Sequence, residues 1–239
     1  MIEQLSLDTF NFILDNTHKL CIIQYKMKTN LLLPFETIPY FTIEAFKQSS
    51  DMDSPHAVRT LLHRWSQAGH ILTLKKGVYM TRRFYELHQT DEAFPLAVSA
   101  ILLLQSYVSL DFVLQQHNLL TEITYPVTCI TTKNTRTIKN TVGTFWYRSI
   151  RDDLYTGFSI FDYLGVRYAR ASLAKALFDY LYLRPIPVAY RALKFNLAEE
   201  LRLNLDELDQ PSWDEFALHV ESSASRKMHD ILKNFRSHS

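Results

Sequence analysis

The amino-acid sequence predicts an α+β protein made of two domains, which we place at residues 1–88 and 89–239. Three observations lead to this prediction. At 239 residues, 47% of them hydrophobic, the chain is long for one small domain and can fill two cores. Residues 54–80 combine a helix pattern with two short apolar runs around a basic turn. The second half mixes β-branched runs with further helix patterns.

The best-marked element is a helix predicted over Pro55–Ala68. Ser54 is a suitable N-cap because its hydroxyl can accept a backbone N–H, and Pro55 fits the first helical position. Gly69 follows where helices commonly end in left-handed backbone. One helix face is apolar: Val58, Leu61, Leu62, Trp65 and Ala68. The opposite face is polar and basic: His56, Arg59, Thr60, His63, Arg64 and Gln67.

Two short strands are predicted next, over Ile71–Leu74 and Val78–Met80, joined by a basic turn. A shorter helix over Ile43–Gln48 precedes the linker to Pro55–Ala68. Two helices followed by a basic-tipped hairpin are the layout of a winged helix-turn-helix, with Pro55–Ala68 as its recognition helix. We therefore predict an N-terminal winged helix-turn-helix domain, preceded by a helical extension over residues 1–28.

The second half of the chain predicts a mixed α/β C-terminal domain. Helix patterns cover Phe94–Leu104, Leu110–Leu119, Ala171–Arg184, Val188–Leu203 and Trp213–Phe235. Strand patterns cover Val127–Thr131, Thr144–Tyr147, Phe158–Phe161 and Val166–Ala169. The polar and basic connection Thr132–Gly143 is predicted to be a loop.

Positive charge is segregated along the chain, although the formal net charge is only +1. Ser54–Tyr85 holds six Lys or Arg residues and no acid, and Ile123–Arg151 holds five and no acid. This leaves 15 of the 26 basic residues, against all 25 acidic residues, in the rest of the chain. Such segregation is typical of a surface that neutralises phosphate groups.

These features predict that the first domain binds double-stranded DNA. Side chains of the recognition helix would contact base edges or phosphates in the major groove, and the hairpin would contact phosphate or the minor groove. The candidate DNA-binding residues are Ser54, His56, Arg59, Thr60, His63, Arg64, Lys75, Lys76, Arg82 and Arg83. Two of them, Arg82 and Arg83, could equally be ordinary solvated charges.

A second basic surface is predicted in the acid-free segment Ile123–Arg151. Its candidate residues are Lys133, Arg136, Lys139, Arg148 and Arg151. Lys and Arg can simply protect a sheet edge against pairing with another strand. The complete absence of acids favours a second surface for nucleic acid or for a partner.

Catalytic and metal-binding interpretations have less support in the sequence. Only five glycines are present, and neither a nucleotide-binding glycine motif, a zinc-protease motif nor a nucleophile elbow occurs. His56, His63 and His70 recur every seven residues, but no cysteine or carboxylate joins them. Asp51 and Asp53 have the spacing of a nucleotidyltransferase pair without the glycine-containing turn that such enzymes need upstream. We therefore expect no metal, no cofactor and no enzymatic activity.

Three features of the sequence indicate the cellular compartment of the protein. Cys21 and Cys129 lie far apart and match no metal spacing, which favours a reducing environment. The start, MIEQLSLDTF, has neither the basic nor the apolar region of a signal peptide. The most apolar stretch, Leu96–Leu114, is interrupted by polar residues and falls short of a membrane span. We predict a cytoplasmic protein without a membrane partner, and the oligomeric state stays open.

The order of segments from about Tyr40 to Arg184 resembles the AbiEi-type antitoxins of bacterial abortive-infection (type IV) toxin–antitoxin systems. The segments are YFTIEAF, VRTLLHRWSQAGHILTLKKGVYM, YVSLDFVLQQHNLL, PVTCITT, GTFWYRSI and SLAKALFDYLYLR. The resemblance implies a winged helix that binds the operator of its own operon. It also implies a C-terminal domain that acts against a nucleotidyltransferase toxin encoded alongside. On this resemblance Arg59, Arg64, Lys75 and Lys76 occupy DNA-reading positions, and Lys175 has a structural role.

The leading hypothesis from the sequence is a non-enzymatic, sequence-specific DNA-binding repressor that is the antitoxin of its own operon. One alternative is a winged-helix regulator unrelated to toxins, whose C-terminal domain serves sensing or assembly. A third interpretation, a nuclease or transferase, predicts carboxylates clustered in a cleft of the C-terminal domain.

Overall fold

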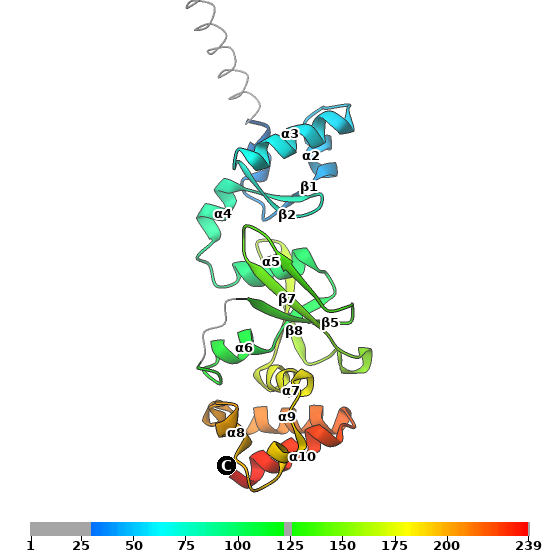
Figure 1. The fold of residues 1–239 in the computed structure, drawn as a ribbon. Helices are drawn as coiled ribbons and strands as arrows, with labels where there is room; N and C mark the ends of the chain where they lie inside the picture. Colours follow the sequence, from blue (N-terminus) through cyan, green and yellow to red (C-terminus); the bar gives the residue numbers. More distant parts are fainter. Residues whose placement is uncertain (1–29, 122–125, 239) are drawn as a thin grey trace, which may run out of the picture. The chain divides into compact units, whose positions relative to one another are not determined.

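The computed structural model describes residues 30–121 and 126–238 and has a mixed α+β fold with two β-sheets (Figure 1). The helix predicted over residues 1–28 lies outside the described residues. The chain divides into two compact units between Leu87 and His88, one residue before the predicted boundary. We call them the N-terminal unit and the C-terminal unit and describe each by itself.

The N-terminal unit holds a small three-stranded sheet and short helices. In chain order its elements are η1 (Asn30–Phe35), β1 (Phe41–Thr42), α2 (Ile43–Ser49), α3 (Pro55–Gln67), β2 (Ile71–Lys75) and β3 (Val78–Thr81). The sheet order is β1-β3-β2, and both pairings are antiparallel. Helix α4 (Arg82–His88) follows and spans the division between the units. The predicted helices over Ile43–Gln48 and Pro55–Ala68 and both predicted strands are confirmed.

Local hydrogen bonds explain where the two main helices of the N-terminal unit begin. The Thr42 hydroxyl accepts the Ala45 N–H at 3.1 Å, and the Ser54 hydroxyl accepts the Ala57 N–H at 3.3 Å. Each bond satisfies a backbone donor that has no partner inside the helix. The apolar stripe of α3 then packs on α2 and the sheet, and the rings of Phe46 and Trp65 meet edge to face with 5.5 Å between their centroids. Helix α3 is thereby fixed with its polar face outward.

The C-terminal unit is built on a six-stranded sheet. Its strands are β4 (Ser106–Val108), β5 (Val127–Thr131), β6 (Arg136–Lys139), β7 (Thr144–Ser149), β8 (Phe158–Tyr163) and β9 (Val166–Ala171). The order across the sheet is β6-β7-β5-β4-β9-β8. The pairs β5–β7 and β4–β9 are parallel, and the other pairs are antiparallel. All four predicted strands are confirmed, with small changes at their ends.

Helices accompany this sheet and follow it in the chain. They are α5 (Phe94–Leu102), α6 (Asp111–Gln116), α7 (Leu173–Leu183), α8 (Leu197–Glu200), α9 (Gln210–Ser222) and α10 (Arg226–His238), with 3-10 turns η2 (Asp152–Leu154), η3 (Val188–Arg191) and η4 (Leu205–Glu207). Helix α5 covers one face of the sheet, where the Tyr147 hydroxyl donates to the Ser99 carbonyl at 2.8 Å. Rings of Trp213, Phe216 and Phe235 join α9 to α10.

Strand β6 lies inside the segment that the sequence predicted as a loop, so that prediction was wrong. Its sequence, Arg-Thr-Ile-Lys, contains one aliphatic residue, and its side chains are mostly exposed. An edge strand of this kind carries no apolar alternation because neither of its faces is fully buried. Backbone pairing with β7, from Arg136 opposite Tyr147 to Lys139 opposite Thr144, holds it in the sheet.

The predictions of two long helices near the C-terminus were also wrong. The segment Val188–Leu203 forms η3 and the short α8 instead of one helix, and Asn196 caps α8 through its side-chain oxygen. The segment Trp213–Phe235 is broken at Ala224, which has a φ of +49°. A left-handed residue reverses the path of the chain, so α9 and α10 can pack against each other. Helix periodicity alone does not reveal such a break.

Candidate nucleic-acid interface

The outer face of α3 carries most of the candidate DNA-binding residues at its surface. His56, Arg59, His63 and Arg64 are exposed, and Thr60 is half-buried. They lie on this face because Val58, Leu62 and Trp65 occupy the opposite side and are buried in the core. An exposed helix face with two arginines and no acid is suited to contacts with phosphates and base edges. Ser54 is committed to the helix cap through its hydroxyl, although it is also exposed.

One side of this face borders a cavity of about 490 Å³. His56, Thr60 and Arg64 line its polar side, four residues apart along α3. Its apolar lining comes from Leu31, Met52, Ala57 and Leu61. The face is therefore hollowed beside the helix, which the sequence pattern did not indicate because Leu31 and Met52 belong to other segments.

The β2–β3 hairpin presents its two lysines differently. Lys76 is exposed at the turn, next to Gly77, whose φ of +78° is readily adopted only by glycine. The Gly77 carbonyl accepts the Ile43 N–H at 3.2 Å, which ties the turn to the start of α2. Lys75 is half-buried, and burial lowers the pKa of its amine. Lys76 is thus the better placed of the two for a phosphate.

Arg82 and Arg83 lie close to acidic residues. The Arg82 Nε donates to the Gly69 carbonyl at 3.1 Å and lies 3.9 Å from Glu86. The Arg83 Nε lies 3.4 Å from a carboxylate oxygen of Glu36. The acid-free run in the sequence is therefore not acid-free in space, because residues outside the run fold against it. Of the two interpretations left open for this pair, the contacts favour ordinary surface charge.

Four of the five residues of the second basic surface lie on or beside the β6–β7 edge of the sheet. Lys133, Arg136, Lys139 and Arg148 are all exposed there. Arg151 lies beyond β7 and is held locally, since its guanidinium donates to both carboxylate oxygens of Asp153 at 3.1 and 2.8 Å. The paired Asp153 neutralises that charge, so we restrict the second basic surface to the four residues at the edge.

A buried polar network in the C-terminal unit contains two oppositely charged side chains. Lys175 and Asp179 on α7 are fully buried, with the Lys175 Nζ 2.6 Å from an Asp179 oxygen. The Tyr107 and Ser109 hydroxyls donate to the other oxygen at 2.9 and 2.8 Å. Burial lowers the pKa of Lys175 and raises that of Asp179, and their opposite charges counteract both shifts. The network joins α7 to β4.

This network extends to α9 through a histidine that the sequence did not single out. The Ser172 hydroxyl donates to Glu215 at 2.6 Å, and His219 lies 3.3 Å from the same carboxylate oxygen. Burial, reinforced by the charge of Lys175, lowers the pKa of His219. The i,i+4 spacing of Lys175 with Asp179 was visible in the sequence, but their burial was not. The hydrogen bonds of the network join α7 to β4 and to α9.

Two searches of the described residues complete the survey of sites. Within residues 30–121 and 126–238, no three His, Cys, Asp or Glu side chains are grouped so as to hold a metal ion. In the same part of the chain, the helices are all too short or too polar to cross a membrane.

Comparison with known proteins found neither a matching family model nor a matching curated protein.

Proposed function

We propose that this chain is a cytoplasmic, sequence-specific DNA-binding repressor whose N-terminal unit is a winged helix-turn-helix. The observation that carries the proposal is the outer face of α3, where Arg59, His63 and Arg64 are exposed, followed in the chain by a hairpin whose turn exposes Lys76. In this proposal α3 enters the major groove, and Lys76 contacts a phosphate next to it. An arginine that reaches guanine discriminates against the wrong base by about 1–3 kcal/mol.

Gel shifts on the DNA upstream of its own gene test this proposal. Arg59→Ala combined with Arg64→Ala should abolish the specific shift while leaving the fold intact, since both side chains are exposed. Arg226→Ala combined with Arg236→Ala on α10 is the matched control, because it removes the same charge from exposed positions in the other unit. Wild-type affinity in the α3 variant, or an equal loss in both variants, would rule out α3 as the recognition helix.

We further propose that the repressor is an antitoxin that counteracts a nucleotidyltransferase toxin encoded beside it. The support is the resemblance of the segments from Tyr40 to Arg184 to AbiEi-type antitoxins. Co-expression with the neighbouring nucleotidyltransferase should restore growth that the toxin alone arrests. Because the proposed antitoxin activity resides in the C-terminal unit, the Arg59/Arg64 double variant should still protect. Failure of the wild-type chain to protect would contradict the antitoxin proposal and leave the repressor proposal standing.

One observation favours the alternative, a regulator unrelated to toxins with a sensing domain. A cavity of about 450 Å³ lies among the last helices of the C-terminal unit, lined by Glu199, Asn204, Asp206, Trp213 and Phe235 among others. Two carboxylates beside an indole ring could bind a small cation. Operator binding without protection from the neighbouring toxin would favour this alternative.

A further inference from the structure

Strands β6 and β7 present a side of the sheet with an unusual composition. In an antiparallel pair, residues directly opposite each other point to the same side, and residues two apart along a strand share that side. Thr137 is opposite Trp146, and Lys139 is opposite Thr144. One side of the two strands therefore carries Thr135, Thr137, Lys139, Thr144, Trp146 and Arg148. We call it the Trp146 face.

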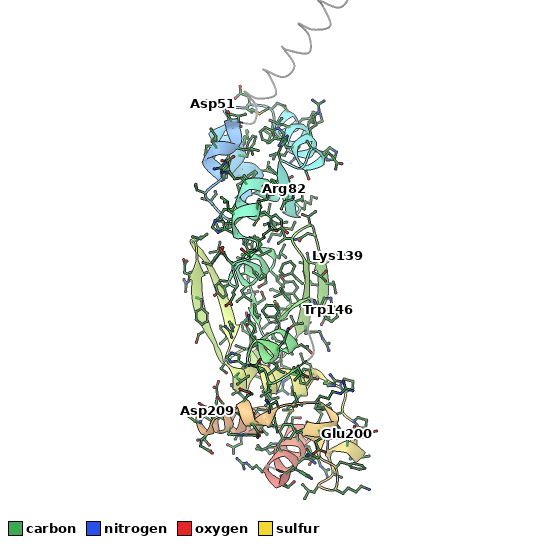
Figure 2. All side chains as sticks on the ribbon, turned by 90° about the vertical axis from the view of Figure 1, so that its left-hand side faces the viewer. Asp51, Arg82, Lys139, Trp146, Glu200 and Asp209 are labelled. Carbon is green, nitrogen blue, oxygen red and sulfur yellow. The ribbon has the colours of Figure 1, made fainter. Side chains whose placement is uncertain are left out.

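On this side, the sheet is covered by a helix at β5 and is open to solvent at β7. Next to β7, strand β5 has Thr128 beside Trp146, and Thr128 is buried. Helix α6 covers that position, where the Phe112 N–H donates to the Thr128 hydroxyl at 3.1 Å. Trp146, one strand further out, is 48% exposed (Figure 2). On the reverse side of β7, Phe145 and Tyr147 are buried. The exposed indole is thus on the uncovered side of a strand whose other side belongs to the core.

The polar groups around Trp146 are complementary to a nucleotide chain. Arg148 is two residues along β7, a distance of about 6.6 Å. Lys139 lies on the neighbouring strand, and Thr137 is directly opposite the indole. Lys139 lies on the edge strand β6 and Trp146 on its neighbour β7, and both residues are labelled in Figure 2. The six described residues of this face comprise an exposed aromatic ring, cations and hydroxyls without an acid. Such a set can stack one base on the ring while the cations contact flanking phosphates.

We propose that the Trp146 face binds unpaired nucleotides of single-stranded nucleic acid. A base stacks on the indole of Trp146, and Arg148 and Lys139 neutralise the phosphates on either side of it. The bases of a duplex are stacked on one another, so they cannot stack on a flat sheet face. This activity is separate from duplex binding by α3, and it does not depend on the proposed operator.

Fluorescence anisotropy with labelled 12-mers of deoxyuridine and of uridine, which differ only in the sugar, tests the proposal on the full chain. The wild type should bind at least one of the two oligomers more tightly than a duplex of unrelated sequence, and the pair identifies the preferred sugar. Trp146→Ala should weaken this binding by about tenfold or more, and Trp146→Phe should retain most of it because phenyl also stacks. The indole is half exposed, so neither change should prevent folding.

Salt dependence separates stacking from charge. Trp146→Ala should lower affinity equally at all salt concentrations, because it removes no phosphate contact. Arg148→Ala should flatten the plot of log affinity against log salt by about 0.7, the value for one phosphate on a single strand. Phe161→Ala is the matched control, since Phe161 is 44% exposed on β8 at the opposite edge of the same sheet. It should leave affinity and slope unchanged.

Two results would overturn the proposal. The first is oligonucleotide binding by Trp146→Ala that equals the wild type, and the second is an equal loss of binding in Phe161→Ala. In the first case, a change of the Trp146→Ala chain from dimer to monomer in sedimentation would identify the face as a contact between copies of this chain. The Arg59/Arg64 double variant should retain oligomer binding, so a failure of the operator proposal is distinguishable from a failure of this one.

Discussion

Lys175 and Asp179 form an ion pair from which water is excluded, since both side chains are fully buried. Removing two charges from water costs free energy that their attraction and hydrogen bonds must offset. The Tyr107 and Ser109 hydroxyls supply those bonds to Asp179. Loss of one charge leaves the other unpaired in the core. The pair therefore fixes how α7 packs on β4 more than it adds net stability.

We predict that Lys175→Met and Asp179→Asn each lower the free energy of unfolding by about 3–5 kcal/mol. The double variant should lose less than either single variant, because no unpaired charge remains and Asn still accepts hydrogen bonds from Tyr107 and Ser109. Urea unfolding of the four proteins gives the coupling energy directly. Strictly additive losses would show that the two charges do not act as a pair.

His219 should make stability depend on pH. Its pKa is lowered by burial and by the charge of Lys175, whereas in the unfolded chain it takes up a proton near pH 6.5. The unfolded state therefore binds more protons once the pH drops below about 6.5. The contribution of His219 is complete above that pH and is lost as the pH falls toward the lower pKa of the folded state.

We predict that His219→Gln unfolds with a smaller loss of stability between pH 7.5 and 5.5 than the wild type. Denaturant midpoints at several pH values measure the difference. His117, whose pKa is lowered by burial and by Arg170, acts in the same direction and is unchanged in both proteins. Parallel pH profiles for the two proteins would mean that His219 is not held neutral in the fold.

At the scale of elements, the β2–β3 hairpin has a short turn that a backbone hydrogen bond ties to α2. The bond from the Ile43 N–H to the Gly77 carbonyl holds the turn against α2, so the hairpin presents one exposed lysine and one half-buried lysine. Both lysines were predicted from the sequence to contact phosphates. Their different burial separates them, because a half-buried amine has lost part of its freedom to reach a phosphate.

For operator DNA we predict that Lys76→Ala flattens the plot of log affinity against log salt by about 0.9, the value for one phosphate of a duplex. Lys75→Ala should change the slope less. Filter binding between 50 and 200 mM salt measures both variants against the wild type. A slope that stays the same in Lys76→Ala would remove the hairpin from the interface.

The edge strand β6 could not be recognised from the sequence pattern. Its four residues contain no apolar alternation, because neither face of this edge strand is fully buried and only Ile138 is half-buried. Its backbone pairing with β7 brings Lys139 and Thr137 beside Trp146. The Trp146 face therefore exists only as a product of strand pairing between segments that are separate in the sequence.

At the scale of the whole molecule, the two units have separate cores. Leu62 is fully buried in the N-terminal unit, and Leu177 is fully buried in the C-terminal unit. Each core excludes water by itself, so each unit can unfold as a cooperative block. Each unit also contains the whole of one acid-free run, Ser54–Tyr85 in the N-terminal unit and Ile123–Arg151 in the C-terminal unit.

We predict two thermal transitions in calorimetry. Leu62→Ala and Leu177→Ala should each cost about 2–5 kcal/mol in their own core. Each change should therefore lower one transition by several degrees and leave the other nearly unchanged. A single transition that both substitutions lower equally would mean that the units unfold together.

The sequence by itself determined the features that depend on neighbouring residues. The cap at Ser54, the apolar stripe of α3 and the hairpin after it follow from hydrogen bonds and periodicities within a few residues. The residues that carry these patterns are only a few positions apart, so the patterns can be recognised without knowledge of distant segments. Even here the Arg151–Asp153 pair, only two residues apart, was within reach of the sequence and was not predicted.

Only the tertiary structure decided which charged side chains are exposed and which are buried or paired with an opposite charge. Glu36 lies against Arg83 although 47 positions separate them in the chain. Lys175 and Asp179 are buried because α7 packs on the sheet, and Trp146 is exposed because α6 covers β5 but not β7. Ion pairing and burial depend on which distant segments meet, and that is settled by the packing of the whole unit.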